Sequence, residues 1–163
     1  MNVDGSFQAE SGAGGVGVVV RDERGRCVVA FAKPFPHAHS AFHMEAEAVR
    51  EGLVLAATLS WDGLIVESDC SLLVTALLGD VSDRSDVSRV MDDCKLRIAA
   101  LGSIQVCHIN REANGVAHRL ATLASNSSST SIWYEEAPAI IQDVLFEDSC
   151  MVTRGLGAMS PSM

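Results

Sequence analysis

The 163-residue chain predicts an α/β fold built on a mixed sheet. Strand-like segments joined by a hairpin signal come first, and later strand-like segments alternate with stretches of helical periodicity. Strands joined by hairpins pair antiparallel, whereas strands separated by helices pair in parallel and bury their faces under those helices. We therefore expect a sheet that is antiparallel at one side and parallel at the other, with helices on both faces.

The first three strands are predicted from β-rich runs and one turn. Residues 2–7 begin the first strand, and residues 15–21 and 26–32 are rich in valine and other strand-forming residues. The turn between the second and third runs, Asp22 to Gly25, ends in glycine, which is typical of a hairpin. These three segments should form the antiparallel side of the sheet.

The later elements follow from apolar spacing. After the Pro34-x-Pro36 break, apolar side chains recur at helical intervals, and the next apolar runs are short enough to be buried strands. The predicted elements are a helix over 41–56, a strand over 63–68, helices over about 70–78 and 86–101, a strand over 104–109, and a helix over about 111–124. The order is therefore β-β-β-α-β-α-α-β-α.

This pattern divides the chain into four parts. Residues 1–124 form one α/β domain, and the serine-rich residues 125–131 form a linker. Residues 132–150 carry enough apolar side chains for a short docked helix, and residues 151–163 are expected to be disordered. Because the chain begins only a few residues before the middle of its first strand, we expect a truncated gene product.

Composition limits the compartment and the partners. Five cysteines without C-x-x-C spacing are typical of reduced intracellular thiols. No apolar run approaches the roughly 20 residues of a membrane span, and no signal sequence is present, so we expect an intracellular protein without membrane attachment. Cytoplasm and nucleus are not distinguished. The net charge of −9, from 12 basic and 21 acidic residues, predicts weak and salt-sensitive binding to nucleic acid.

Three carboxylates stand where strands end or helices begin. Asp4 lies in V-D-G-S-F, Glu45 in M-E-A-E-A and Asp69 in V-E-S-D-C. Brought together, they would form an oxygen site that suits Mg²⁺ or Mn²⁺ better than zinc. Two such ions about 3.5–4 Å apart can activate a water and stabilise the leaving oxygen of a phosphodiester. Taken singly, Asp4 could be a turn residue, Asp69 a helix N-cap and Glu45 part of a solvated helix face.

The most specific motif is H-I-N-R-E-A-N-G-V-A-H, which runs from His108 to His118 and contains Asn114. With the three carboxylate segments, it resembles the RNase H-type domains of plant non-LTR retroelement reverse transcriptases over roughly residues 1–124. The resemblance implies an RNase H-like fold whose five strands lie in the order 3-2-1-4-5. It also implies that Asp4 bridges two metal ions.

The resemblance assigns further roles. It favours Glu45 over Glu47 as the second carboxylate, because the family has a glutamate seven residues before the glycine of a G-L-x-L-A stretch, here Gly52. His108 would assist product release or proton transfer. His118 stands where active members carry aspartate, and because imidazole is a poor ligand for Mg²⁺ we expect reduced, Mn²⁺-dependent cleavage. Gly5, Ser6 and Asn114 are the candidate nucleic-acid contacts.

Two functions are therefore expected from the sequence. The first is a metal-dependent endonuclease that hydrolyses the RNA strand of RNA/DNA hybrids, with Asp4, Glu45, Asp69 and His118 as metal ligands. The alternative is a catalytically inactive, retroelement-derived domain that acts as a nucleic-acid-binding or interaction module. We expect a monomer in either case, and the sequence specifies no protein partner.

Two other patterns are discounted. The G-x-G-x-x-G run from Gly12 to Gly17 matches a dinucleotide-binding fingerprint, but a strand follows it instead of a helix, so it is interpreted as a flexible lead into that strand. His37, His39 and His43 have spacing that could hold zinc, but an exposed loop is the favoured interpretation.

Overall fold

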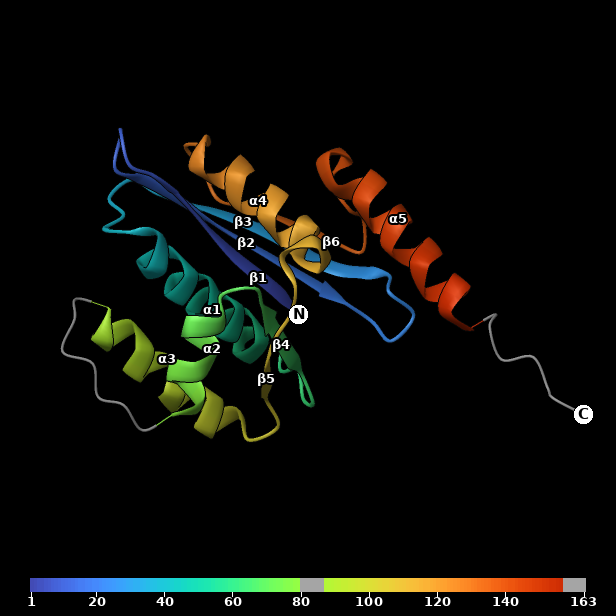
Figure 1. Cartoon of the computed structure of the whole chain (residues 1–163), viewed down its shortest axis with the longest axis horizontal. Helices are drawn as coiled ribbons and strands as arrows, with labels where there is room; N and C mark the ends of the chain where they lie inside the picture. The colour runs from blue at the N-terminus through green and yellow to red at the C-terminus, as the bar shows by residue number, and fades with distance from the viewer. Residues whose placement is uncertain (80–86, 157–163) are drawn as a thin grey trace, which may run out of the picture.

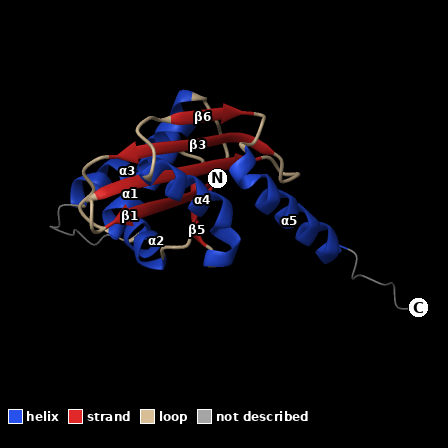
Figure 2. Cartoon of the chain, turned by 90° about the horizontal axis from the view of Figure 1, so that it is seen from above, coloured by secondary structure: helices blue, strands red, loops and turns tan. Residues whose placement is uncertain are grey.

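The computed structural model describes residues 1–79 and 87–156, and their fold is a mixed α/β sheet with helices on both faces. The helices α1, α2 and α3 lie on one face, and α4 and α5 lie on the other (Figure 1). Turning the molecule by 90° shows the strands of the sheet side by side (Figure 2). The helices are α1 (Ala41–Thr58), α2 (Ser71–Leu78), α3 (Ser88–Leu101), the short 3₁₀ helix η1 (Arg111–Asn114), α4 (Gly115–Ser125) and α5 (Ala139–Leu156).

The sheet has six strands in the order β5-β4-β1-β2-β3-β6. The strands are β1 (Asn2–Gln8), β2 (Ala13–Arg21), β3 (Cys27–Phe35), β4 (Ile65–Ser68), β5 (Gln105–His108) and β6 (Ser131–Tyr134). The pairs β1–β2 and β2–β3 are antiparallel, whereas β1–β4 and β4–β5 are parallel. The predicted order 3-2-1-4-5 is therefore confirmed, with one strand added beyond β3.

Two apolar clusters hold the layers together. The larger lies between the sheet and α1–α3 and includes Val18, Met44 and Leu53, whereas the smaller lies under α4 and α5 and includes Val19 and Leu120. Neighbouring valines of β2 belong to different clusters because successive side chains of a strand point to opposite faces. A central strand covered on both faces explains the nearly continuous apolar run in β2.

The parallel pair β1–β4 begins at the first residue of the chain. The Met1 ammonium group donates to the Ile65 carbonyl at 2.6 Å, and the Glu67 backbone N–H donates to the Met1 carbonyl at 2.8 Å. The strands are in register at Asn2 and Glu67. These contacts fix the position of β1, the strand that carries Asp4, against β4, the strand that precedes Asp69.

The C-terminal part packs more closely on the domain than the sequence predicts. The expected extension over 132–150 contributes β6, which pairs antiparallel with β3, and the helix α5, which is longer than expected. Ile141 of α5 is fully buried in the smaller cluster, and Arg119 of α4 pairs with Asp143 at 2.6 Å. Of the tail expected to be disordered, residues 151–156 are helical and residues 157–163 lie outside the described residues.

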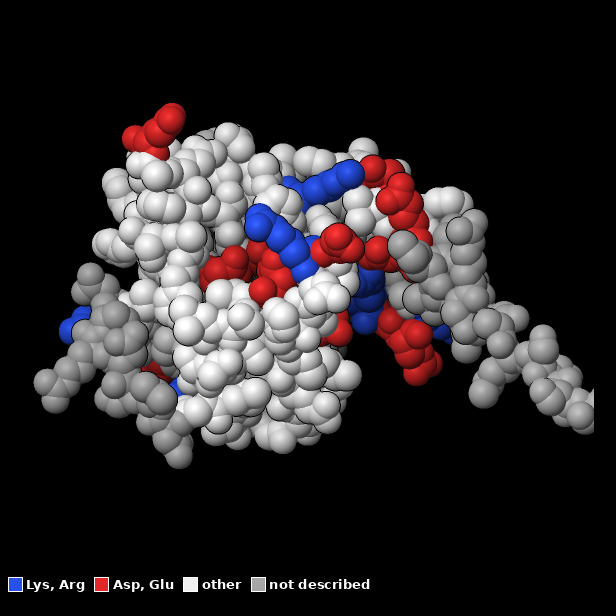
Figure 3. Space-filling view, viewed as in Figure 1, with Lys and Arg blue, Asp and Glu red and all other residues white. Residues whose placement is uncertain are grey.

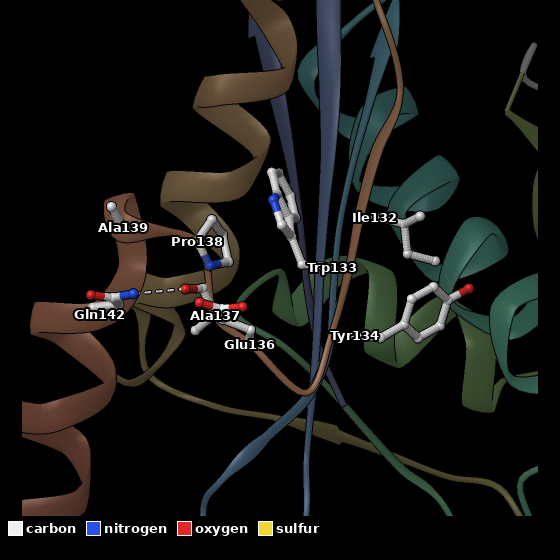
Figure 4. A pocket seen from close by; sticks show the side chains of 8 residues that line it. All are labelled: Ile132, Trp133, Tyr134, Glu136, Ala137, Pro138, Ala139 and Gln142. Atoms are coloured by element: carbon white, nitrogen blue, oxygen red, sulfur yellow. Dashed lines mark hydrogen bonds between the residues drawn. The ribbon is translucent and has the colours of Figure 1, made fainter.

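A groove follows the junction between β6 and α5 (Figure 4). Trp133 points to the side of β6 that faces α4, whereas Ile132 and Tyr134 point to the opposite side. The start of α5 is held by the Gln142 side chain, which donates to the Ala137 carbonyl at 2.9 Å. Within residues 1–79 and 87–156, no helix is long and apolar enough to cross a membrane.

Glycines in the sheet allow α1 and α4 to approach the strands at backbone distance. A Cβ atom placed on Gly17 would collide with the Ala117 carbonyl oxygen and the Ala121 backbone nitrogen of α4. One placed on Gly5 would collide with the backbone of α1 at Met44 and Glu45. These clashes involve backbone atoms, which cannot rotate away as the end of a flexible side chain could. Gly15 and Gly17 of β2 therefore form a packing surface for α4.

We expect Gly17→Ala to lower the free energy of unfolding by about 1–3 kcal/mol, because the added methyl group overpacks a contact between backbones. Gly115→Ala is the matched control: its Cβ would meet Val144 at an ordinary 3.5 Å, within a helix. Urea unfolding followed by circular dichroism measures both. Equal stability of the two variants would contradict the close approach of α4.

Candidate metal centre

Three carboxylates from separate parts of the chain meet at one point of the fold. Asp4 comes from β1, Glu45 from α1, and Asp69 follows the end of β4. One ligand oxygen from each lies within 4.8 Å of the others. Acidic side chains gather in the hollow between α4 and the helices α1 and α2 (Figure 3). The structure thus assembles the three carboxylates that the sequence analysis selected.

The local structure around each carboxylate explains this convergence. Because β1 and β4 are adjacent and parallel, Asp4 and Asp69 lie near the same edge of the sheet. The helix α1 begins at its N-cap Ser40, whose hydroxyl accepts from the backbone N–H of His43 at 3.0 Å. The absence of a side chain at Gly5 then lets the second turn of α1 pass beside Asp4 and places Glu45 there.

Burial and mutual repulsion make the centre electrostatically unfavourable when all three groups are charged. Burial raises the pKa of Asp4 to about 6, opposed by its hydrogen bond with His118. Burial, followed by the nearby charges of Asp4 and Asp69, raises the pKa of Glu45 to about 9. The Oε2 atom of Glu45 is buried without a hydrogen-bond partner. A hard divalent cation would relieve both conditions, so these residues fit such an ion.

Glu47, the competitor of Glu45, lies outside the centre. Its carboxylate is paired with Arg50 at 2.7 Å and lies 3.4 Å from the Nε2 atom of His43. The contact with Glu47 engages one ring nitrogen of His43, and the other ring nitrogen lies 3.4 Å from the backbone nitrogen of His39. Among the described residues, Asp4, Glu45 and Asp69 come together as a group that could hold a metal ion, whereas His37, His39 and His43 form no such group.

His118 reaches the centre from α4. Its Nδ1 atom lies 2.9 Å from Oδ2 of Asp4, and about half of its side chain is exposed. The position of this ring depends on the glycines of β2, since Ala117, the residue before His118, packs its backbone against Gly17. The structure therefore places the imidazole against one carboxylate of the cluster.

Asn114 is buried between β1 and the cluster. Its Nδ2 atom donates to the Val3 carbonyl at 2.9 Å and to Oδ1 of Asp69 at 3.1 Å, and the residue is 1% exposed. These bonds leave no exposed donor for the nucleic-acid contact predicted for Asn114. The side chain instead orients Asp69, a role that the spacing of the motif could not reveal because it depends on the path of β1.

The other predicted residues surround the centre. The hydroxyl of Ser6 donates to the Ser125 hydroxyl at 3.3 Å and is partly buried. Gly5 supports Glu45 through its close contact with α1 and through a hydrogen bond from its backbone N–H. His108 is exposed at the end of β5, where it is in register with Ser68, the residue before Asp69. Their predicted roles toward nucleic acid stay predictions.

Comparison with known proteins gives a family and a fold. The model of the family described as reverse transcriptase-like matches residues 2–124, which include the whole centre. No match was found among the curated proteins.

Solved structures of ribonucleases H resemble the chain at low sequence identity. RNase H1 from the archaeon Halobacterium salinarum superposes with a TM-score of 0.71 at 21% identity, over 77% of this chain and 95% of that one. LC11-RNase H1, isolated from compost by a metagenomic approach and solved with an RNA/DNA hybrid, gives 0.65 at 20% identity over 77% and 94%. The foamy viral protease–reverse transcriptase, also with a hybrid, gives 0.61 at 15% identity, over 76% of this chain but 19% of that one. At these identities the likeness shows the fold alone.

We expect Glu45→Gln to raise the melting temperature of the metal-free protein at pH 8. The pKa of Glu45 is raised from 4.5 to about 9 in the folded state, so the folded protein binds more protons than the unfolded chain between these values. The free energy of unfolding therefore falls as the pH rises through this window. The neutral amide of glutamine carries no charge into the centre, so the variant avoids this loss of stability. Its melting temperature should rise by about 2–4 °C for each kcal/mol of unfolding free energy recovered.

The measurement is thermal unfolding in a chelating buffer at pH 5 and pH 8. The rise in melting temperature caused by Glu45→Gln should be smaller at pH 5, because Glu45 is already protonated in the folded protein at that pH. Glu10→Gln, at an exposed turn position, is the control and should change neither value. A lower melting temperature for Glu45→Gln at pH 8 would show that the repulsion is absent.

Proposed function

Because this chain belongs to the reverse transcriptase-like family, we propose that it is a divalent-metal-dependent nuclease of the RNase H type. The observation that carries the proposal is the convergence of Asp4, Glu45 and Asp69, whose ligand oxygens lie within 4.8 Å of one another. The family match supports an RNase H-type fold, and the three carboxylates are the candidate ligands for the metal ion that hydrolysis requires. A binding domain would have no need to bring three mutually repelling acids together at one point.

The three carboxylates would hold Mg²⁺ or Mn²⁺. A bound ion of this kind activates a water and stabilises the leaving oxygen in phosphodiester hydrolysis. Asp4 is central because it contacts His118 and lies beside Glu45, whereas Asp69 is oriented by Asn114. His108 would assist turnover from the exposed end of β5, next to Asp69 in the register of the sheet.

We propose the RNA strand of an RNA/DNA hybrid as the substrate. Support comes from LC11-RNase H1 and the foamy viral enzyme, which share the fold and were solved with RNA/DNA hybrids. A hybrid presents ribose 2′-hydroxyls on one strand alone, which proteins read mainly by shape. Ser6, on β1 two residues beyond Asp4, is the candidate polar contact. With a net charge of −9, the protein should bind this substrate best at low salt.

A second candidate is supported by the residue at position 118. The resemblance found in the sequence implies an aspartate at this position in active members, and His118 would then leave the centre with one negative charge fewer. A domain that has lost cleavage could still bind nucleic acid or a protein through the same fold. This candidate, an inactive retroelement-derived module, predicts a folded protein without hydrolytic activity.

The test of the proposed function is cleavage of a labelled RNA/DNA hybrid at low salt, in Mg²⁺ and in Mn²⁺. We expect cleavage of the RNA strand by the unaltered protein and a loss of at least about 100-fold in rate for Asp69→Asn, because 100-fold is about 2.7 kcal/mol and a metal ligand supplies several. Single-stranded RNA and duplex DNA of the same sequence test the selectivity.

Asp62→Asn is the matched control, since Asp62 is exposed in the loop before β4 and carries the same chemical change. It should cleave at the rate of the unaltered protein. Equal activity of Asp69→Asn and Asp62→Asn would point to a contaminating nuclease. No cleavage in either metal, by protein with a cooperative unfolding transition, would leave the inactive module as the function.

A further inference from the structure

Two aspartates of the centre are hydrogen-bonded to neighbouring side chains. Oδ2 of Asp4 lies 2.9 Å from Nδ1 of His118, and Oδ1 of Asp69 accepts from Asn114 at 3.1 Å. One oxygen of each aspartate is therefore already engaged by a side chain. One carboxylate oxygen from each of Asp4, Glu45 and Asp69 lies within 4.8 Å of the others, and these three oxygens form one compact set. Oε2 of Glu45 is buried without a hydrogen-bond partner.

This set suits a single ion. Hard divalent cations are bound at about 2.0–2.6 Å from oxygen, so three oxygens within 4.8 Å of one another can surround one ion. Two ions would have to lie about 3.5–4 Å apart and would need ligands beyond this set. Two further side chains contact the acids: His118, which is hydrogen-bonded to Asp4, and Asn114, which donates to Asp69. Neither adds a negative charge.

Charge leads to the same conclusion. Three carboxylates carry three negative charges, which more than balance one divalent ion but fall short of the four positive charges of two. The second ion would share Asp4 with the first and would find an imidazole, which carries no negative charge, where a fourth carboxylate would stand. Binding of that ion through Oδ2 of Asp4 would also compete with the hydrogen bond between Asp4 and His118.

We propose that this protein binds one divalent ion, Mg²⁺ or Mn²⁺, and that the hydrogen bond between His118 and Asp4 takes the place of a second. His118 is then a positioning residue that holds Asp4, and it is not a metal ligand as the sequence analysis expected. The inference rests on the proposed function, because it concerns the same centre. It makes a separate statement about the number of ions.

The experiment counts bound ions directly. Mn²⁺ is titrated into the unaltered protein, and free Mn²⁺ is measured by electron paramagnetic resonance, with the shape of the bound signal as a second readout. We expect one bound ion per chain and no spin coupling, which a pair of ions about 4 Å apart would produce. Two ions in the unaltered chain, or a coupled pair, would overturn the inference.

Two variants test whether His118 limits the protein to one bound ion. In His118→Asp we expect a second bound ion and a coupled signal, because the fourth carboxylate restores the missing ligand and charge. Thr122→Asp adds the same carboxylate one turn further along α4, at an exposed position, and should keep one ion. A single ion in a folded His118→Asp would show that His118 does not set the number. If that variant does not fold, the count in the unaltered chain alone decides.

The two proposals fail in different ways. Cleavage of the hybrid together with two bound ions would refute the single-ion inference and leave the nuclease in place. No bound ion, together with no cleavage, would refute both. One bound ion without cleavage would support the inference and refute the nuclease.

Discussion

The close approach of two helices to the sheet is the constraint on which the rest of the structure depends. At Gly5 the backbone of α1 lies against β1, and at Gly17 the backbone of α4 lies against β2. Each contact positions a side chain of the candidate centre, since Glu45 lies at the contact of α1 and His118 follows that of α4. A side chain at either glycine would push its helix outward by the width of a methyl group. The centre would then lose a carboxylate or its hydrogen-bonded imidazole.

The centre also shows how stability is given up for chemistry. Asp4 is 4% exposed, and Glu45 buries an oxygen that has no partner. Elsewhere in the chain, acids with little exposure are paired: Glu47 with Arg50 and Glu51 with Lys33. In both of these pairs a buried acid is compensated by a neighbouring positive charge. The three acids of the centre face one another instead, and such local conflicts are expected where a site is built for a ligand.

Much of the fold followed from patterns in the sequence. The hairpin turn at Asp22–Gly25 and the alternation of later strands and helices predicted the mixed sheet, and the family motifs fixed the strand order. The choice of Glu45 rested on family spacing; in the structure Glu45 lies in the carboxylate cluster and Glu47 pairs with Arg50, while the role of Glu45 stays a prediction. The role of Asn114 could not be predicted, since its partners lie 111 and 45 residues away in the sequence. The packing role of the glycines in β2 was hidden in a run that was interpreted as flexible.

The strand β6 and the helix α5 extend the fold past the segment that defines the family. The family match ends at residue 124, yet β6 pairs with β3, and Ile141 completes the apolar cluster beneath α4. A fragment cut at the family boundary would leave β3 as an open edge with unsatisfied backbone groups and would uncover that cluster. Open edges invite pairing between molecules, so such a fragment would aggregate even with an intact centre. The functional unit of this chain is therefore larger than its family signature.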